Sequence, residues 1–369
     1  MEFYDSGNIV SQFATQGTIT DIRPLGKGLI NDSYHVYTLE KGMPEYVLQR
    51  INNSIFTNVE LLMHNIISVT SYIKEKYQRM NIQDIDRRVL SFVPLKNDPT
   101  KYFIQDDNGN YWRLMIYIQN SKSISEVNPE TSYNVGLSFG QFESILADIP
   151  TRLEETIPNF HNMEFRLQQL QEAVENDRAH RYADVKDIVD DILRDQEDMC
   201  KGEKLYREGK LPKRICHCDT KVDNLLFDND TNDVLCVIDL DTVMPNFVFS
   251  DIGDFLRSAA NTSKEDEEDL DKVNFDLTIF HSFIRGYLES AKAFLLPIEI
   301  ENIPYATQLF PYMQAVRFLT DYLNGDTYYK IQYPEHNLIR TKAQFKLYQS
   351  VKEHAVHMDA FIKECLSNR

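Results

Sequence analysis

Residues Ile215 to Asp241 read ICHCDTKVDNLLFDNDTNDVLCVIDLD, and this stretch decides the fold. Val234 to Ile238 is a short apolar run, which predicts a buried strand that ends at Asp239. Asn224 to Phe227 predicts a second strand, joined to the first across an Asn- and Asp-rich turn. Because a hairpin places the start of one strand next to the end of the other, we expect Asn224 and Asp239 to lie side by side.

Three side chains of this stretch have the order and chemistry that phosphoryl transfer requires. Asp219 follows His217 in a His-x-Asp motif, Asn224 comes five residues later, and Asp239 closes the predicted strand. The reaction needs a carboxylate facing the acceptor hydroxyl and oxygen ligands that hold Mg²⁺ on the phosphates of ATP. Asp219 can take the first role. Asn224 and Asp239 can take the second, because Mg²⁺ prefers carboxylate and amide oxygens. A surface hairpin with solvated acidic turns is the alternative interpretation.

Four further residues around the motif each have two interpretations. Asp241 either ligates the metal as well or lies outside the first shell and orients a ligand or water. His217 is more typical of a core histidine that bonds backbone than of a proton carrier. Asp251 and Asp254 precede an apolar helical pattern, so we expect one of them to cap that helix, with a bond to the catalytic loop as the second possibility.

Composition excludes several classes of protein. The chain has 369 residues and a formal net charge of −18, and no cluster of Lys and Arg is dense enough to follow a nucleic-acid backbone. The sequence MEFYDSGN at the start has no signal-peptide pattern, and no apolar run is long enough to span a bilayer. Five cysteines, an odd number, do not form a disulfide framework. We therefore expect a cytoplasmic protein with small-molecule partners and no nucleic-acid or membrane partner.

The pattern of residues changes near Gln119. Up to Ile118 we expect an antiparallel sheet with one helix from Asn58 to Tyr77; the predicted strands are 18–25, 33–39, 46–51, 102–105 and 112–118. After it we expect long amphipathic helices at 129–147, 163–175, 182–206, 273–291, 305–323 and 343–366. This division predicts an α+β, bilobal, protein-kinase-like fold. Residues 1–118 form the small nucleotide-binding lobe, and residues 119–369 form the large, mainly helical lobe that carries catalysis and acceptor binding.

Candidate nucleotide contacts lie in the small lobe and its connector. Gly26 and Gly28 allow the backbone to approach phosphate oxygens, and Asn31 can donate to them. Arg50 ends a predicted strand and either clamps a phosphate or is an exposed strand-end charge. We expect the adenine to lie near the connector around Ile118.

Several motifs together carry a resemblance to a known family. The glycine loop, Val47-Leu-Gln-Arg50, His217 to Asn224, Ile238 to Pro245 and Asp251-Ile-Gly-Asp254 resemble the aminoglycoside phosphotransferase and choline kinase group of small-molecule kinases. The chain is similar in more detail to the N-acetylhexosamine 1-kinases. The segments that carry this closer resemblance are Tyr46-Val-Leu-Gln, Ser54-Ile-Phe56, Asp239 to Pro245, Ser258 to Glu268, Arg317 to Asp326 and Tyr333 to Asn337.

The resemblance implies an ATP- and Mg²⁺-dependent transfer of the γ-phosphoryl group to the anomeric hydroxyl of N-acetylglucosamine or N-acetylgalactosamine. It assigns Asp219 as the base, Asn224 and Asp239 as metal ligands, and Arg317 with Tyr328 as residues that hold the sugar. Without the resemblance, Arg317 reads as a helix-surface charge that can pair with Asp321.

One departure and two alternatives accompany this assignment. Some N-acetylhexosamine kinases have histidine where this chain has Leu29, so either the acceptor differs or another donor such as Asn31 compensates. A kinase for choline, ethanolamine, a homoserine-like compound or an aminoglycoside is the alternative enzyme. A catalytically silent binding module with the same fold is the alternative of a different class.

Overall fold

The computed structural model describes residues 3–26 and 30–367, and within them it has the predicted α+β class, with an antiparallel sheet followed by a mainly helical region. In this described part no helix is both long and apolar enough to cross a membrane. The chain divides into two compact units. Unit 1 contains Met1–Ile124, Asp148–Pro158 and Leu225–Met244, and unit 2 contains Ser125–Ala147, Asn159–Asn224 and Pro245–Arg369. The units therefore differ from two continuous lobes, and the assignment of nucleotide binding to 1–118 and catalysis to 119–369 stays a prediction.

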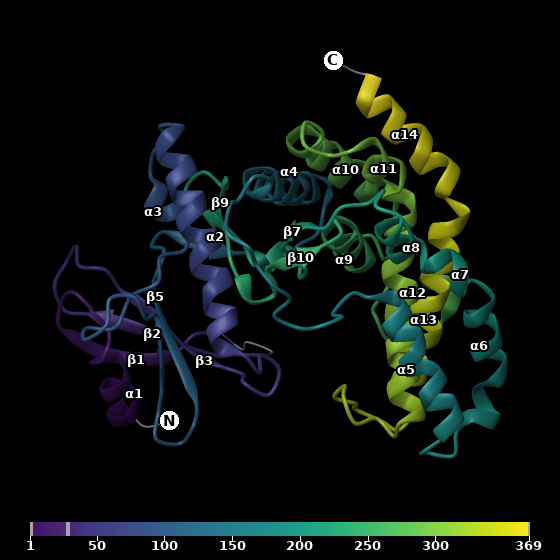
Figure 1. The fold of residues 1–369 in the computed structure, drawn as a ribbon, viewed down its shortest axis with the longest axis horizontal. Helices are drawn as coiled ribbons and strands as arrows, with labels where there is room; N and C mark the ends of the chain where they lie inside the picture. Colours follow the sequence, from purple (N-terminus) through teal and green to yellow (C-terminus); the bar gives the residue numbers. More distant parts are fainter. Residues whose placement is uncertain (1–2, 27–29, 368–369) are drawn as a thin grey trace. The chain divides into compact units, whose positions relative to one another are not determined.

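Unit 1 is built on a five-stranded antiparallel sheet with the order β1-β2-β3-β5-β4 (Figure 1). Its strands are β1 Ile19–Pro24, β2 Asp32–Thr38, β3 Tyr46–Ile51, β4 Phe103–Gln105 and β5 Tyr111–Ile116. In β3 buried residues alternate with more accessible ones over Tyr46 to Gln49, because successive side chains point to opposite faces, whereas four successive residues of β5 are buried. Apolar residues on one face form the core with α1 Phe3–Val10; they include Val36, Leu48, Trp112 and Leu114. All five predicted strands are confirmed within one to two residues.

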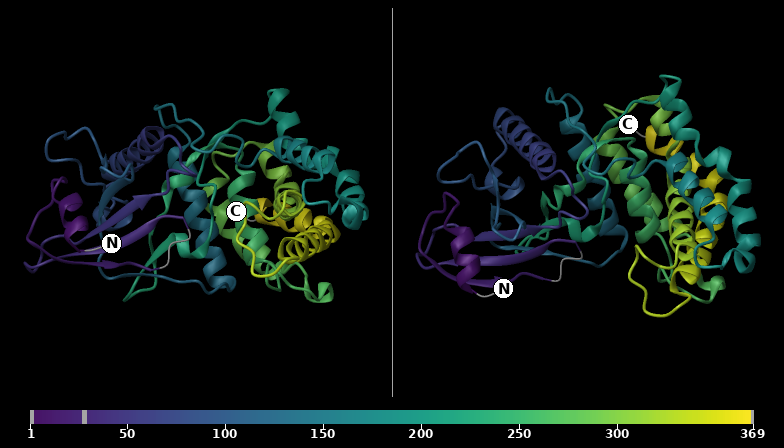
Figure 2. Two further views of the ribbon diagram at one scale, coloured as in Figure 1. Left: turned by 90° about the horizontal axis from the view of Figure 1, so that it is seen from below. Right: turned by 60° about the horizontal axis from the view of Figure 1, so that its bottom comes forward.

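The predicted helix of this region is α2, Val59–Arg79, which lies beside the sheet in both views of Figure 2. Asn58 caps its first turn by accepting from the backbone N–H of Leu61 at 3.0 Å. Its buried apolar residues recur at helical spacing and include Leu62, Ile66, Val69 and Ile73. The short helix α3, Ile85–Arg88, follows it. The apolar stripe of α2 therefore explains both its length and its packed face.

A second, three-stranded sheet of unit 1 contains the predicted hairpin. β8 Leu225–Asp228 pairs antiparallel with β9 Val234–Val237 on one side and with β6 Ser121–Ser123 on the other. Leu225, the first residue of β8, lies opposite Val237, the last residue of β9. The chain therefore leaves β9 next to the start of β8. The hairpin from the sequence is confirmed, with the sheet assigned to unit 1 by its packing.

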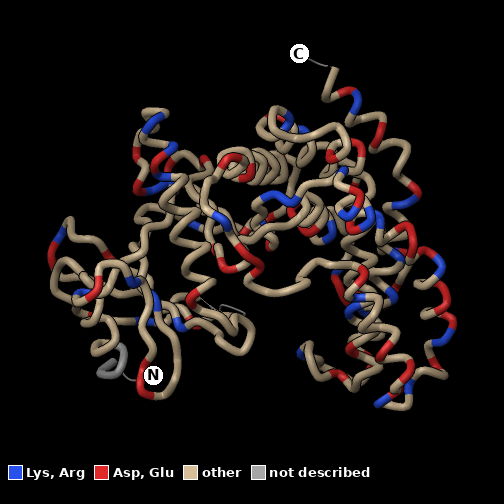
Figure 3. The backbone as a smooth tube through the Cα atoms, in the orientation of Figure 1, with Lys and Arg blue, Asp and Glu red and all other residues tan. Residues whose placement is uncertain are grey.

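Unit 2 is mainly helical. Its helices are α4 Pro129–Leu146, α5 Met163–Asn176, α6 Tyr182–Arg194, α7 Gln196–Met199, α8 Lys201–Arg207, α9 Phe249–Ala259, α10 Leu277–Ala291, α11 Pro297–Glu301, α12 Ile303–Leu323, α13 His336–Glu353 and α14 Ala355–Ser367. The predicted helix 182–206 is thus three shorter helices, and 343–366 is two helices that begin at His336. β7 Arg214–Cys216 forms a two-stranded sheet with β10 Met244–Asn246. Basic and acidic residues are interspersed along the backbone of each unit (Figure 3).

Two helix pairs hold unit 2 together. α12 packs along α13, and α4 packs closely against α10 (Figure 1). The second contact depends on glycine: a Cβ at Gly136 would lie 2.1 Å from the carbonyl oxygen of Phe283, and one at Gly286 would lie 2.1 Å from that of Tyr133. Because real side chains cannot approach backbone this closely, these glycines allow the two helices to touch. The contact brings Glu143 of α4 against Tyr287 of α10.

Candidate active site

The loop that carries Asp219 is held by two carboxylates from α9. Asp251 accepts hydrogen bonds from the backbone N–H groups of His217 at 2.8 Å and Cys218 at 2.7 Å. Asp254 accepts from the backbone N–H of Thr220 at 3.0 Å. The prediction that Asp251 or Asp254 caps the helix is wrong, because α9 begins at Phe249 and both residues lie inside it. The second possibility, a bond to the catalytic loop, is confirmed for both.

The backbone just before Asp219 adopts an uncommon conformation. Cys218 has a φ of +63°, in the left-handed region that non-glycine residues rarely occupy. Its N–H bond to Asp251 opposes the cost of this conformation. His217 is fully buried and packs edge-on against the rings of Phe139 and Phe142, as expected for a core histidine. The loop is thus fixed on both sides of the candidate base.

Asp219 lies among groups suited to phosphoryl transfer. The side-chain amide of Asn224 donates to the Asp219 backbone carbonyl at 2.8 Å and to its carboxylate at 3.2 Å. Since the amide nitrogen is used in this way, the amide oxygen of Asn224 is the atom left for a cation. Lys221 pairs with the Asp219 carboxylate at 2.6 Å, a contact that we did not predict. The sequence signal for it is the Asp-x-Lys spacing, which places a cation beside the base.

Asp254 of α9, which holds the loop, has a clearly raised pKa. The pKa of Asp254 is raised to about 6, chiefly by burial; the charge of Arg257 opposes this rise, the Asp219 carboxylate adds to it, and Lys221 opposes it. Lys221 itself has a raised pKa: burial favours its neutral form, but the contacts with Asp219 outweigh this effect. Two residues of the loop, Asp219 and Lys221, and Asp254 of α9 therefore bring two acidic groups and one cation together.

Asp239 is the other predicted metal ligand. It follows Ile238, which is the first residue after the end of β9. It has a φ of +58°, so the chain turns sharply at this residue instead of continuing the strand. Asn224 belongs to unit 2 and Asp239 to unit 1. Their convergence on one Mg²⁺ ion, and the metal-binding role of each, therefore stay predictions.

Both carboxylate oxygens of Asp241 contact side chains of unit 1. Arg113 of β5 pairs with one carboxylate oxygen at 2.6 Å, and the side-chain amide of Asn31 donates to the other at 2.6 Å. This arrangement gives both carboxylate oxygens a contact within unit 1, and the two interpretations of Asp241, metal ligand and orienting residue, both stay predictions. It also gives Asn31 a partner inside the protein. We did not predict the role of Arg113 from the sequence. A charged residue within the apolar strand Tyr-Trp-Arg-Leu-Met-Ile is nevertheless a signal of a buried ion pair.

The predicted nucleotide contacts lie at separate points of unit 1. Gly26 has a φ of +69°, which suits a tight turn, whereas Gly28 and Leu29 lie outside the described residues. Arg50 pairs with Asp32, its neighbour on β2, and both side chains are exposed. Ile118 is buried, and its carbonyl accepts from the hydroxyl of Ser121 at 2.6 Å. Contact of these residues with ATP stays a prediction.

The predicted sugar contacts, Arg317 and Tyr328, lie on either side of the end of α12. The helix ends at Leu323, so the two residues do not share a helical face. Asp321 does not form the suggested ion pair with Arg317. Its carboxylate instead accepts from the backbone N–H groups of Thr327, Tyr328 and Tyr329 and from the amide of Asn337. Asp321 therefore shapes the loop that presents the exposed Tyr328.

Arg317 belongs to a basic cluster with Arg166 of α5. Neither guanidinium forms an ion pair with a carboxylate in the described part of the chain; Arg317 donates to Gln314, and Arg166 donates to Gln169 and to the carbonyl of Phe160. Burial lowers the pKa of Arg166 to about 10, and the charge of Arg317 adds to this effect. The Arg317 guanidinium also lies 5.7 Å from the centre of the Tyr329 ring. With a pKa of about 10, Arg166 retains its positive charge at neutral pH.

Comparisons with solved structures show the same fold at low sequence identity. An aminoglycoside phosphotransferase from Alicyclobacillus acidocaldarius matches with a TM-score of 0.63 at 10% identity, over 97% of this chain and 96% of the other. A microcompartment-associated aminopropanol kinase matches with a TM-score of 0.59 at 13% identity, over 96% and 98%. An ethanolamine kinase from Plasmodium vivax matches with a TM-score of 0.53 at 14% identity, over 88% and 81%.

The solved structures are too distant in sequence to assign a family, but a family model matches most of the chain. The model described as the phosphotransferase enzyme family, APH, matches residues 21–282, a range that contains the glycine loop, the loop of Asp219, the hairpin and α9. The chain therefore belongs to the APH phosphotransferase enzyme family.

Proposed function

We propose that this phosphotransferase is a small-molecule kinase that transfers the γ-phosphoryl group of ATP to the anomeric hydroxyl of an N-acetylhexosamine, with Mg²⁺ as the cofactor. The observation that carries the kinase chemistry is the arrangement of Asp219, Lys221 and Asn224 on one braced loop. The sugar assignment rests on the segments that resemble the N-acetylhexosamine 1-kinases, above all Arg317 to Asp326 and Tyr333 to Asn337.

The proposed mechanism assigns each step to residues of this chain. Asp219 accepts a hydrogen bond from the acceptor hydroxyl and takes its proton as the oxygen–phosphorus bond forms and the bond to the β-phosphate oxygen breaks, so that ADP leaves. Lys221 balances the Asp219 charge and offers a cation toward the transferring group. The amide oxygen of Asn224 and the carboxylate of Asp239 are suitable ligands for Mg²⁺, which supplies charge neutralisation at the phosphates when bound.

The basic cluster of Arg166 and Arg317 supports a neutral acceptor over a cationic one. A choline- or aminoglycoside-like acceptor requires carboxylates and aromatic faces near its charge, whereas these two arginines have only neutral hydrogen-bond partners among the described residues. A sugar hydroxyl or an acetamido oxygen can accept from such donors. Tyr328 and Tyr329 lie in the loop after α12. Their aromatic faces are surfaces on which the apolar side of a sugar can pack.

The decisive experiment measures ADP release and identifies the product. The protein is given ATP and Mg²⁺ with N-acetylglucosamine, N-acetylgalactosamine, their non-acetylated parents, choline or ethanolamine, and phosphorus NMR assigns the position of the new phosphate. We expect turnover with the N-acetylated sugars and phosphate at C1. Phosphate at C6, or preference for choline or ethanolamine, contradicts the sugar 1-kinase proposal. A parallel reaction in EDTA is the control, and we expect it to release no ADP.

A further inference from the structure

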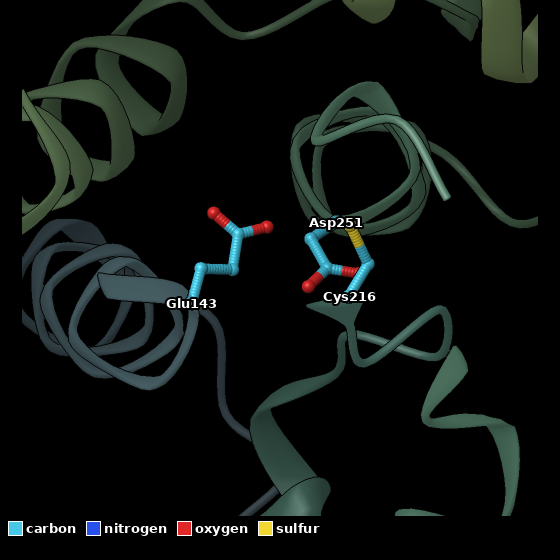
Figure 4. A group of neighbouring side chains, drawn as sticks. All are labelled: Glu143, Cys216 and Asp251. Carbon is cyan, nitrogen blue, oxygen red and sulfur yellow. The ribbon is translucent and has the colours of Figure 1, made fainter. Parts of the chain in front are cut away.

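Three buried side chains of unit 2 meet behind the candidate catalytic loop (Figure 4). They are Glu143 of α4, Cys216 of β7 and Asp251 of α9, and their possible ligand atoms all lie within 4.8 Å of one another. Glu143 is only 1% exposed and the other two are fully buried. Figure 4 shows the carboxyl group of Glu143 facing the Asp251 side chain. Two carboxyl groups this close, in surroundings without solvent, require an explanation.

The hydrogen bonds of the two carboxyl groups differ. Both oxygens of Asp251 accept backbone N–H bonds, from His217 and Cys218, and such bonds favour the charged carboxylate. Glu143 accepts from the hydroxyl of Tyr287 with one oxygen, and its other oxygen is buried without a donor. No Lys or Arg in the described part of the chain forms an ion pair with either group. Arg214 lies nearby, but it pairs with Glu299 at 2.9 Å. Two bare carboxylates in this site are therefore strongly disfavoured.

We infer that Glu143 is a protonated carboxylic acid that donates its hydrogen bond to the Asp251 carboxylate and thereby positions the loop of Asp219. A proton on the second Glu143 oxygen satisfies that buried atom and leaves one negative charge in place of two. The hydrogen bonds then run from Tyr287 to Glu143, from Glu143 to Asp251, and from the loop N–H groups to Asp251. The residue is a positioning residue, since it acts on the candidate base only through Asp251.

The charges around the site agree with this assignment. Burial, together with the Asp251 charge, raises the pKa of Glu143 well above its ordinary value. Burial also raises the pKa of the Cys216 thiol well above its ordinary value, and this thiol contacts the carbonyl of Asn246 at 3.6 Å, so a metal-binding thiolate is disfavoured. The titratable and charged groups that interact electrostatically with Glu143 come from β7, α9, α10, α11 and the loop after β7: Arg214, Cys216, Cys218, Asp251, Tyr287 and Glu299.

The proton makes a prediction about stability that is independent of catalysis. Between the ordinary glutamate pKa and the raised value, the folded protein holds a proton that the unfolded chain has released, so the folded state loses stability as the pH rises. Glu143→Gln retains a neutral donor and removes this titration. We expect the unfolding equilibrium constant of the wild type, divided by that of Glu143→Gln, to rise about tenfold per pH unit between pH 5 and 7. Urea unfolding followed by circular dichroism measures it, with the exposed Glu130→Gln on the same helix as the control that follows the wild type.

The positioning role is tested by kinetics, which rest on the proposed kinase function. Glu143→Gln should keep kcat within about threefold, whereas Glu143→Leu should lower kcat by about tenfold or more at an unchanged KM for ATP, because small misplacements of reacting groups cost up to about 10²-fold. Equal pH slopes for the wild type and Glu143→Gln overturn the protonation, and full kcat in Glu143→Leu overturns the positioning role. If the wild type releases no ADP with any acceptor, the kinase proposal fails instead, and the pH slope still decides where the proton lies.

Discussion

Replacing Arg113 by methionine should destabilise unit 1 far more than replacing any exposed arginine of the same sheet. The Arg113 side chain is 2% exposed and its partner Asp241 is 5% exposed, with 2.6 Å between the charged atoms. Methionine retains much of the aliphatic volume but removes the charge. The substitution therefore isolates the electrostatic part of the contact.

The expected loss follows from what remains buried. Without Arg113 the Asp241 carboxylate keeps the Asn31 amide as its one side-chain donor among the described residues, and an unpaired buried charge costs about 3–5 kcal/mol. Gln49 also loses the Arg113 N–H that donates to its side-chain oxygen, which adds about 1 kcal/mol. We expect the free energy of unfolding to fall by about 4 kcal/mol or somewhat more.

The chain contains its own probe for this measurement. Trp112 is the single tryptophan, it is buried next to Arg113, and it belongs to unit 1. Urea unfolding followed by its fluorescence therefore reports the unit that carries the substitution. Arg50→Met is the matched control: Arg50 pairs with Asp32 in the same sheet, with exposed fractions of 46% and 47%, so we expect a loss of about 0–1 kcal/mol.

A double substitution separates the charge from the packing. Arg113→Met together with Asp241→Leu removes both charges, and replacing a buried pair by apolar groups is often close to neutral, so the double variant should recover most of the lost stability. If Arg113→Met loses no more than Arg50→Met, or if the double variant is as unstable as the two single losses added together, the assignment of a buried, charged pair is refuted.

Three further predictions concern unit 2. Asp219→Asn should lower kcat by roughly 10²- to 10⁴-fold with nucleotide affinity retained, measured by ADP release and ATP titration, and full turnover rules out Asp219 as the base. The pKa of Asp254 is raised to about 6, so the free energy of unfolding should fall by about 3 kcal/mol as the pH rises from the ordinary aspartate pKa near 4 through 6. Asp254→Asn should lack this fall when urea unfolding is compared at pH 4 and 7. Asp321→Ala removes the hydrogen-bond acceptor of three backbone N–H groups, so the free energy of unfolding should fall by roughly 3 kcal/mol. The KM for the sugar should also rise if Tyr328 contacts it. An unchanged unfolding curve contradicts the role of Asp321 in holding this loop.

Much of the fold was predictable because it depends on local patterns. The apolar spacing of α2 and the alternation in β3 are properties of short segments, so each pattern can be recognised without the rest of the chain. The hairpin of β8 and β9 was predictable for the same reason, since two apolar runs flank a polar turn. Breaks inside long helical patterns, such as the one after Arg194, were missed because periodicity continues through a short interruption.

The partners of charged residues were harder to predict, because they come from distant parts of the chain. Asp251 and Asp254 looked like helix caps by sequence position, and only the packing of α9 against β7 and its loop shows that they hold backbone N–H groups of the loop after β7. Asp321 looked like a partner for Arg317, one turn away, but the turn after α12 brings three backbone N–H groups to it.

The sequence by itself determined which residues we propose for phosphoryl transfer, since the order of Asp219, Asn224 and Asp239 and the strands around them are encoded within one short stretch. Only the tertiary structure decided which partners each carboxylate has. Arg113 is 128 residues from Asp241 along the chain, and Glu143 is 108 residues from Asp251, so no local pattern records either contact. Desolvation and hydrogen bonding set the state of a buried charge, and both depend on neighbours that meet only when the chain has folded.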